Sequence, residues 1–450
     1  MNSNDTIAAI ASAPGRGAVG VIRVSGPLVP RIALGVLGEV PAPRLARLSS
    51  FLDARGSSLD AGLVLYFPAP ASYTGEDVLE LQGHGGALVL DMVLQRLLDL
   101  GCRMARPGEF SERAFLNGKI DIAQAEAIAD LIDAGTTAAA RAAVRSMQGE
   151  FSARIAELKS RITQLRAYVE AAIDFPDEEI DFLSGEALRE RLTAIFTGFE
   201  SITAAARQGA LLREGLNVVI AGLPNAGKSS LLNRLAGDEI AIVADAPGTT
   251  RDVLRQHVHL DGLPVNLVDT AGLRAAVDAV EAEGVRRARS EIGRADRILY
   301  VVDAAAAAES RSLTEELAQL PPGIAVTLII NKIDLTGMPP RVDDAVEPPR
   351  VWVSARTGLG VDLLRAHLLQ GAGYLKAESG AFAARRRHLD ALSRARGHVQ
   401  SAADGWSETR AFELFAEDLR LAQLALSEIT GEFTSEDLLG EIFGSFCIGK

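Results

Sequence analysis

Lysine, cysteine and long apolar runs are scarce in this chain of 450 residues, and positive charge is in the minority. The 46 lysine and arginine residues face 59 aspartate and glutamate residues, so the formal net charge is −13. A chain this acidic has no general attraction for nucleic acid or for an anionic membrane surface. A tight stand-alone nucleic-acid binder is therefore not expected, although the composition leaves room for a local basic patch.

The two cysteines, Cys102 and Cys447, form no Cys-x-x-Cys pair. Neither a zinc site nor a disulfide framework is expected, and a reducing compartment is the natural setting. No apolar run approaches the roughly 18 residues of a transmembrane helix. The N-terminal apolar stretch lacks a preceding basic region and is too short for a signal peptide, so we expect a cytoplasmic protein.

Hydrophobic residues make up 48% of the chain and charged residues 23%, as in folded globular proteins. The length suggests about three domains. Residues 1–118 combine short strand-like runs (19–24, 61–67 and 77–81) with turns and one helical segment (87–100). This mixture predicts an N-terminal α+β domain, in which Cys102 would belong to the core.

Residues 119–214 and 376–450 are helical in pattern. In each block apolar residues recur at alternating spacings of three and four, from Ile155 to Ala172 and from Phe412 to Ile429. Such a stripe predicts a helix that buries one face. We expect the two blocks to pack on each other as one discontinuous helical domain.

Residues 215–375 lie between the helical blocks and alternate apolar strands with helical segments. The expected strands are 217–221, 264–268, 297–302, 325–330 and 350–353. This alternation predicts an inserted, doubly wound and mostly parallel α/β domain.

A phosphate-binding motif opens this inserted domain. Residues 222–229 read GLPNAGKS and fit the pattern G-x-x-x-x-G-K-[ST] between a predicted strand and a predicted helix. In such a loop the backbone amides and the helix N-terminus surround phosphates. Lys228 is expected to reach the β- and γ-phosphate oxygens, and the Ser229 hydroxyl to bind Mg²⁺.

Three further motifs follow at successive strand ends. In DTAG (269–272), Asp269 is expected to hold the Mg²⁺ shell through water, and the Gly272 amide to sense the γ-phosphate. In NKID (331–334), the Asp334 carboxylate can accept from guanine N1–H and the 2-amino group, which adenine does not offer. The run 354–356 (SAR) supplies a further base contact, so the sequence predicts a GTPase.

The segment 248–252 (GTTRD) occupies the place of a switch, and Thr250 is the expected second Mg²⁺ hydroxyl. Leu273 follows DTAG, where Ras-like enzymes carry the glutamine that orients the attacking water. Another group must therefore orient water and neutralise charge here. The expected GTP contacts are Asn225, Ala226, Gly227, Lys228, Ser229, Ser230, Ala244, Asp245, Ala246, Pro247, Gly248, Thr249, Thr250, Asp269, Thr270, Ala271, Gly272, Asn331, Lys332, Asp334, Ser354, Ala355 and Arg356.

These motifs, with Asn225, the PGTTRD switch and Leu273, resemble the potassium-activated TrmE-Era-EngA-like P-loop GTPases. Within that group the chain from Asp5 to Lys450 resembles the MnmE (TrmE) family of tRNA modification GTPases. The segments that make the resemblance specific are DTIAAIASAPGRGAVGVIRVSG at the start, SYTGEDVLELQGHGG, RPGEFSERAFLNGKIDIAQAEAIADLIDA and the terminal CIGK.

The resemblance implies a homodimer whose two Ras-like GTPase domains close around GTP, Mg²⁺ and K⁺. It implies that K⁺ is bound by Asn225, Thr249 and the carbonyls of Ala244 and Ala246. It also gives Glu281 the water-orienting role, beside Lys228 and Thr250 as catalytic residues. From the sequence alone, without the resemblance, Glu281 reads as a solvated carboxylate on a helix.

The resemblance further implies that residues 1–118 bind 5-formyl- or 5,10-methylene-tetrahydrofolate near the dimer interface, through Arg23, Glu80, Lys119 and Lys450. A carboxylate suits the donor edge of a pterin, and cations suit its glutamate tail. Without the resemblance, Arg23 and Glu80 read as surface charges on strands. Cys447 has a modification role in the family and otherwise reads as an inert thiol.

The implied function is a K⁺-stimulated GTPase that works on tRNA with an FAD-dependent partner, MnmG (GidA), as a heterotetramer. Together they add a carboxymethylaminomethyl or aminomethyl group to C5 of the wobble uridine, position 34. One alternative is a ribosome-assembly RNA-binding GTPase, which predicts a basic RNA-binding module. Another is a folate-dependent methyltransferase with a regulatory GTPase, which predicts a nucleophile or acid–base cluster in residues 1–118.

The choice between lysine and arginine is informative about the sites, because only six of the 46 basic residues are lysine. Four of these, Lys119, Lys228, Lys332 and Lys450, lie in the candidate site segments, which favours a specific use of the compact ammonium group. The run 385–388 (RRRH) is either a contact for a phosphate backbone or a solvated helix face.

Overall fold

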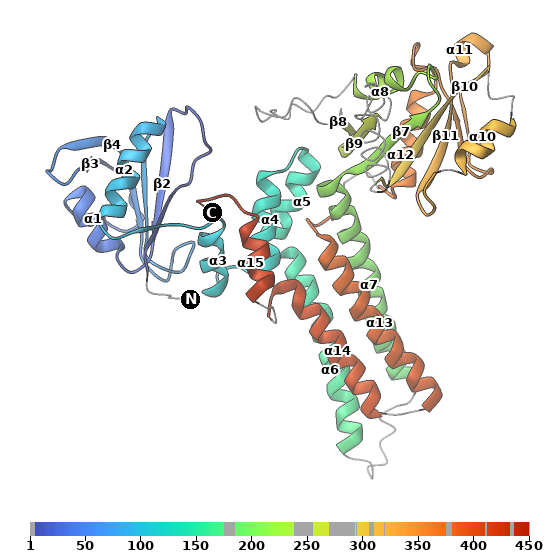
Figure 1. Cartoon of the computed structure of the whole chain (residues 1–450). Coiled ribbons are helices and arrows are strands. Elements are labelled where there is room, and N and C mark those ends of the chain that lie inside the picture. Colours follow the sequence, from blue (N-terminus) through green and yellow to red (C-terminus); the bar gives the residue numbers. More distant parts are fainter. Residues whose placement is uncertain are drawn as a thin grey trace. The chain divides into compact units, whose positions relative to one another are not determined.

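The structure is a computed structural model that describes residues 5–174, 185–237, 255–269, 293, 295–305, 310–318, 320–374, 380–409, 412–432 and 436–449. The chain divides into two compact units (Figure 1). Unit 1 comprises residues 1–129, 147–182 and 394–450, and unit 2 comprises residues 130–146 and 183–393. The expected domain boundaries at 118, 214 and 375 stay a prediction. None of the described helices has the length and apolar character that a membrane span requires.

Unit 1 contains a six-stranded sheet of order β3-β4-β5-β2-β1-β6, in which only β1 and β6 pair in parallel. Its strands are β1 (Ile7–Ile10), β2 (Val19–Ser25), β3 (Arg47–Leu52), β4 (Ser58–Phe67), β5 (Val78–His84) and β6 (Arg103–Met104). Helices α1 (Val29–Leu37) and α2 (Ala87–Asp99) cover one face of this sheet (Figure 1). The α+β prediction for residues 1–118 is thereby confirmed, and burial raises the pKa of the core thiol Cys102 to about 12.

The rest of unit 1 is helical. Its helices are α3 (Glu109–Leu116), α6 (Glu150–Asp174), α14 (Phe412–Thr430), α15 (Glu436–Gly444), and parts of α4 (Ile122–Ile132), α5 (Thr137–Met147) and α13 (Arg386–Thr409). Helices α6 and α14 pack along each other (Figure 1), and Leu158, Leu165, Leu419 and Leu426 are buried. The predicted apolar stripes therefore meet, because each can leave water only against the other.

Unit 2 contains a seven-stranded sheet of order β12-β13-β11-β10-β7-β9-β8. Its strands are β7 (Leu216–Gly222), β8 (Arg255–Leu260), β9 (Leu263–Asp269), β10 (Arg297–Asp303), β11 (Ala325–Asn331), β12 (Arg341–Asp343) and β13 (Arg350–Trp352). The five inner strands run parallel, whereas β8 and β12 are antiparallel edges. The predicted mostly parallel sheet is confirmed, with a hydrophobic core on each face.

Five described helices of unit 2 lead into the sheet or connect its strands: α7 (Gly185–Glu214), α8 (Lys228–Ala236), α10 (Ser310–Leu317), α11 (Ile333–Thr336) and α12 (Val361–Gly371). Unit 2 also contains most of α5 and parts of α4 and α13. The sequence interpretation did not predict β1, β3, β6 or β12. β1 has only four residues, and β3, β6 and β12 lie at sheet edges, so none of these strands shows an apolar period long enough to predict it.

The run 385–388 is not a fully solvated face, because two of its residues are bound within the protein. Arg385 Nη2 donates to Asp130 Oδ1 at 3.0 Å, and the Arg385 amide donates to His388 Nδ1 at 3.1 Å. His388 is only 2% exposed. The solvated-face interpretation is therefore wrong for these two residues, which secure the start of α13, while the phosphate contact of the run stays a prediction.

Candidate functional site

The phosphate-binding motif forms the loop between β7 and α8. Gly222 has a φ of 132° and Gly227 a φ of 93°, in the left-handed region that favours glycine. A Cβ atom on Gly222 would lie 2.1 Å from the Val301 carbonyl oxygen, so this approach to β10 requires glycine. The motif thus has the strand–loop–helix geometry that presents backbone amides to phosphate.

Lys228 is the first residue of α8, and its side chain is buried. Its Nζ donates to the carbonyl oxygens of Gly222 at 3.0 Å and Leu223 at 2.7 Å. The ammonium group is therefore held within the loop, where a P-loop lysine reaches phosphate oxygens. Ser229 and Ser230 follow on the exposed side of the first helical turn.

Asn331 connects the phosphate loop with the base-recognition segments. Its side chain is 2% exposed; Nδ2 donates to the Ala226 carbonyl at 2.8 Å, and Oδ1 accepts from the Ala355 amide at 3.0 Å. A Cβ atom on Gly227 would lie 2.3 Å from Asn331 Nδ2, so this contact also needs the glycine. Three separately predicted motifs are thus in direct contact.

Asp334 carries the carboxylate expected to recognise guanine. Ser354 Oγ donates to its Oδ1 at 2.7 Å, and Arg356 Nη2 lies 3.0 Å from its Oδ2. The hydrogen bond from Ser354, with the charge of Arg356, lowers the pKa of Asp334 and keeps it ionised. A carboxylate has about four lone-pair sites, so it can still accept from two N–H groups of a base.

Asp303 is a member of this site that sequence reasoning missed. Its Oδ2 lies 2.7 Å from Lys332 Nζ, and this hydrogen bond lowers the pKa of Asp303. Asp303 ends β10 directly beside Asn331, which ends β11. The available signal was its position, because carboxyl ends of parallel strands meet at one edge of a sheet.

Part of the expected nucleotide site lies outside the described residues. These residues are Ala244, Asp245, Ala246, Pro247, Gly248, Thr249, Thr250, Thr270, Ala271, Gly272 and Glu281. Asp269 ends β9, but its side chain is also outside the description. Of the four expected K⁺ ligands, Asn225 is the one in the described part of the chain, exposed on the loop with a φ of 60°.

A second candidate site lies on the N-terminal sheet. Arg23 and Glu80 are directly opposite in β2 and β5, and Arg23 Nη2 lies 2.9 Å from Glu80 Oε1. The Arg23 guanidinium lies 5.6 Å from the ring centroid of Tyr73 and 5.7 Å from that of Phe110. The predicted pair is thus brought together, between two aromatic rings that the sequence did not single out.

The C-terminal segment crosses the same part of unit 1. The Gly108 amide donates to the Cys447 carbonyl at 3.3 Å, and Ile448 forms a bridge with Pro107. A Cβ atom on Gly449 would lie 2.5 Å from the Ile10 carbonyl, one residue from the β1 neighbour of Arg23. The Cys447 side chain is exposed, and Lys450 lies outside the described residues.

Lys119 is exposed and lies beside the loop that follows Tyr73. A Cβ atom on Gly75 would be 2.9 Å from Asn117 Cβ and 3.2 Å from Lys119 Cε. The loop is fixed by Asn117, whose Nδ2 donates to the Thr74 carbonyl at 2.7 Å. Lys119 therefore borders the loop that carries the aromatic neighbour of Arg23.

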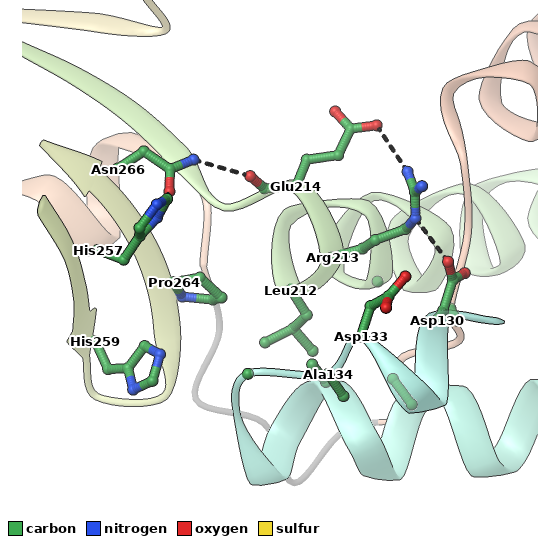
Figure 2. A pocket seen from close by; sticks show the side chains of 15 residues that line it. Asp130, Asp133, Ala134, Leu212, Arg213, Glu214, His257, His259, Pro264 and Asn266 are labelled. Carbon is green, nitrogen blue, oxygen red and sulfur yellow. Dashed lines mark hydrogen bonds and ion pairs between the residues drawn. The ribbon is translucent and has the colours of Figure 1, made fainter. Parts of the chain in front are cut away.

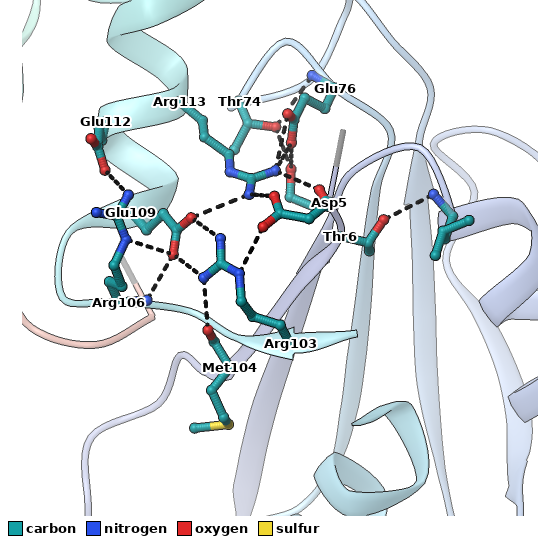
Figure 3. A network of polar contacts seen from close by, with 12 residues as sticks. Asp5, Thr6, Thr74, Glu76, Arg103, Met104, Arg106, Glu109, Glu112 and Arg113 are labelled. Atoms are coloured by element: carbon teal, nitrogen blue, oxygen red, sulfur yellow. Dashed lines mark hydrogen bonds and ion pairs between the residues drawn. The ribbon is translucent and has the colours of Figure 1, made fainter. Parts of the chain in front are cut away.

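A network of ion pairs holds α3 against β1 and β6 (Figure 3). Glu109 Oε1 accepts from Arg103 at 2.6 Å and Arg113 at 3.2 Å, and both arginines also donate to Asp5. Burial alone would raise the pKa of Glu109, but these bonds and a backbone amide outweigh it and lower the pKa to about 2. The network thereby fixes the helix that carries the Phe110 ring beside Arg23.

Comparison with known proteins connects both sites with one family. The family model "GTP-binding protein TrmE N-terminus" matches residues 6–119, and the model "MnmE helical domain" matches residues 122–447. The tRNA modification GTPase MnmE of Proteus mirabilis (strain HI4320) is 56% identical over 454 residues, covering 100% of both chains. The chain belongs to the MnmE family of tRNA modification GTPases.

The MnmE protein of Sodalis glossinidius (strain morsitans) is also 56% identical, with 100% of each chain covered. Among solved structures, the G domain of the FeoB iron transporter of T. maritima is 28% identical and covers 35% of this chain and 98% of its own. Its TM-score of 0.27 carries no weight here. Membership of the MnmE family confirms the predicted family and the multidomain fold class.

Proposed function

We propose that this MnmE-family chain hydrolyses GTP in tRNA modification, at the site formed by the phosphate loop, Asn331 and Asp334. The observation that carries the proposal is the hydrogen bonding of Asn331 to both Ala226 and Ala355. It joins a phosphate-binding loop to a segment whose ionised Asp334 suits the donor edge of guanine. The full-length identity to MnmE proteins favours this function over ribosome assembly.

Two residues in the described part of the site carry oxygen atoms that suit Mg²⁺ and K⁺. Ser229 exposes a hydroxyl at the first turn of α8 beside Lys228, and Asn225 exposes an amide oxygen on the loop; Mg²⁺ and K⁺ prefer oxygen ligands. We assign Mg²⁺ to Ser229 and Thr250, and K⁺ to Asn225, Ala244, Ala246 and Thr249. Bound cations neutralise charge on the phosphates. Lys228 would bind those phosphates and Glu281 would orient the attacking water.

The Arg23–Glu80 pair is proposed to bind a one-carbon tetrahydrofolate. Its support is chemical: a half-buried carboxylate and guanidinium are paired, and the guanidinium lies near the Tyr73 and Phe110 rings, so the pair offers both a donor and an acceptor for polar recognition. Lys119 and Lys450 would serve the anionic glutamate tail. When bound, the folate would supply the one-carbon unit.

A homodimer is proposed because large apolar side chains are exposed on one face of the sheet of unit 1. Leu48 and Leu63 are paired on β3 and β4, and Leu63 lies opposite Gln82 on the face that carries Glu80. Leu48 is 73% exposed and Val19, opposite His84 on the same face, is 61% exposed. A second copy of the chain would remove these side chains from water.

The full proposal is a cytoplasmic, K⁺-stimulated GTPase that acts with the FAD-dependent MnmG (GidA) on the wobble uridine of certain tRNAs. It would add a carboxymethylaminomethyl or aminomethyl group at C5, and GTP hydrolysis would drive a regulatory closure and opening. The net charge of −13 favours a protein that shares its tRNA contacts with a partner.

Nucleoside analysis of tRNA tests this function directly. Cells that lack the protein should lose the C5-modified wobble uridine, and the wild-type chain should restore it. The Lys228→Ala chain should not, because its loop lacks the phosphate-binding ammonium. Unchanged wobble uridines in cells without the protein would contradict the proposal.

A further inference from the structure

Arg234 joins the phosphate-binding helix to the base-recognition loop. It lies in the last turn of α8, about two turns after Lys228. Its Nε donates to the Ala355 carbonyl at 3.1 Å, and its Nη2 donates to the Arg356 carbonyl at 2.7 Å. The two donors share one edge of the planar guanidinium group, so one side chain holds two successive peptide carbonyls.

The segment that Arg234 holds carries several groups of the candidate guanine site. Ser354 and Arg356 both contact Asp334, while the Ala355 amide donates to Asn331. The positions of these three groups all depend on the conformation of the backbone from Ser354 to Arg356. A displaced carbonyl at Ala355 or Arg356 would therefore also displace the partners of the Asp334 carboxylate.

The same backbone segment is tied from two sides. Asn331 approaches it as a buried side chain from the end of β11, whereas Arg234 is exposed and approaches it from α8. The position of a Cβ on Gly358 would be 3.9 Å from Arg234 Cζ, so the guanidinium also lies against the rest of this loop. The backbone closes the loop through the Ser354 amide, which donates to Leu359 at 2.8 Å.

We propose that Arg234 is a positioning residue for guanine recognition. It orients the Asp334 carboxylate indirectly, by fixing the carbonyls of Ala355 and Arg356 against α8, and it makes no contact with the base itself. The inference rests on the proposed guanine site. Because lysine has no paired planar donors, it replaces arginine poorly at this position.

The test measures GDP dissociation with a fluorescent GDP analogue in Arg234→Ala, Arg234→Lys and the control Asn233→Ala. The control changes the neighbouring exposed residue on α8. Arg234→Ala should raise the GDP dissociation rate, because the carbonyls of Ala355 and Arg356 lose their donors. The increase should be only about three- to tenfold, because water can partly replace these exposed bonds. Arg234→Lys should resemble it, and Asn233→Ala should stay within about twofold. The kcat at saturating GTP should change less than about twofold, since the change is remote from the phosphates.

The ratio of GDP to IDP affinity distinguishes positioning from a general loss of structure. IDP lacks the 2-amino group that Asp334 is proposed to bind, so a misplaced carboxylate should lower the ratio, whereas a damaged fold should weaken both nucleotides equally. An unchanged ratio in Arg234→Ala, or a dissociation rate within twofold of wild type, would overturn the inference. In parallel, an unchanged ratio in Asp334→Ala would overturn the guanine site itself. If the ratio of GDP to IDP affinity falls in Asp334→Ala but not in Arg234→Ala, the guanine site is supported and Arg234 does not position it.

Discussion

Asp334 and Glu109 are two carboxylates whose surroundings give them different tasks. The pKa of Asp334 is lowered first by the hydroxyl of Ser354, and the charge of Arg356 adds to this effect. Glu109 is buried, and its pKa falls to about 2 because hydrogen bonds from Arg103, Arg113 and a backbone amide outweigh the cost of burial. Asp334 keeps acceptor sites for a ligand, whereas the oxygens of Glu109 accept hydrogen bonds from Arg103 and Arg113.

Asp334→Asn should reduce the preference for GTP over xanthosine triphosphate by at least about tenfold, since one bond to a charged acceptor is lost and an amide donor faces the 2-amino group. Xanthine has an oxygen at this position and can accept from the new amide. Competition binding with both nucleotides measures the change. Asp343→Asn, at the edge strand β12, is the control, and an equal effect in both variants would contradict the role of Asp334.

Glu109→Gln should lower the free energy of unfolding near pH 7 by up to about 3 kcal/mol, which corresponds to the lowering of its pKa from 4.5 to about 2. A depressed pKa stabilises the fold above the unfolded-state value. This contribution is lost as the pH falls from about 4.5 towards 2, so the difference between wild type and variant should shrink in that window. Urea unfolding at pH 7, 4 and 3 measures it.

Glu428→Gln is the matched control for this prediction. Its carboxylate is paired with Arg394 at an exposed position, so its loss should cost less than about 1 kcal/mol. A difference between wild type and Glu109→Gln that stays constant down to pH 3 would contradict the assigned pKa.

At the scale of elements, α7 packs closely on the segment before α13 and is joined to the sheet of unit 2 by one amide side chain. A Cβ atom on Gly209 of α7 would lie 1.4 Å from the Phe382 carbonyl, so the helix can lie there only with glycine. Asn266 of β9 donates to the Glu214 carbonyl at 3.2 Å and to Asn217 at 3.0 Å, and its oxygen lies 2.7 Å from His257 Nδ1. One side chain thus ties α7, β7, β8 and β9 together.

The contacts of Asn266 border a cavity of about 420 Å³ within unit 2 (Figure 2). Asp133 and His259 line it together with Arg213, which lies 2.8 Å from Asp130. The hairpin of β8 and β9 buries Val258 and Val265 in the core but faces this space with His259 and Asn266, so the Asn266 bonds help to fix its position against α7.

Asn266→Ala should lower the free energy of unfolding by about 1–2 kcal/mol, because the partly buried Asn217 and the Glu214 carbonyl lose a donor. His259→Ala, on the same hairpin and beside the same cavity, serves as the control. It should lower the free energy of unfolding by less than about half of the loss in Asn266→Ala. Denaturant unfolding of the full chain gives both values. Equal losses in the two variants would mean that Asn266 does not tie α7 to the sheet.

At the scale of the whole molecule, an acidic chain places its few lysines where anions are expected. Lys228 and Lys332 lie in the candidate nucleotide site, while Lys159 pairs with Glu432 between α6 and α14. Most of the positive charge is arginine, and some of these arginines pair with carboxylates of the same chain, such as Asp5 and Asp130. Net charge alone therefore says little about which anions this protein binds.

GTP turnover should rise at least about tenfold when K⁺ replaces Na⁺ at constant ionic strength, because a correctly sized cation must neutralise phosphate charge where Leu273 replaces a water-orienting glutamine. Steady-state phosphate release measures the rate. Asn225→Ala should lose most of the response while keeping GDP affinity within about threefold. Equal rates in both salts would contradict the K⁺ assignment.

A reduced folate should bind the full-length protein, and Arg23→Ala should weaken it by about tenfold or more, since one charge-assisted contact is lost and Glu80 is left unpaired. Isothermal calorimetry with 5-formyl-tetrahydrofolate measures the affinity. Arg47→Ala removes an exposed cation on β3 and should leave the affinity unchanged. The same affinity in both variants would remove Arg23 from the proposed site.

The sequence predicted the elements with strong local patterns. The strands of the parallel sheet, the P-loop and the two helical stripes have apolar spacing or motifs that lie within about 30 residues. Strands β1, β3, β6 and β12 were not predicted, because their pattern is weak. Asp303 and the Tyr73 and Phe110 rings were missed as site members, because nothing adjacent in the sequence marks their partners.

The sequence by itself determined the family, the order of the nucleotide motifs and the chemical types of their residues, since each depends on a few neighbouring positions. Only the tertiary structure decided that Asn331 joins two loops, that Arg23 lies between two rings, and that Arg234 holds the base loop. The physical reason is that these contacts link residues 24 to 122 positions apart, whose approach depends on strand register and packing rather than on local conformational preference.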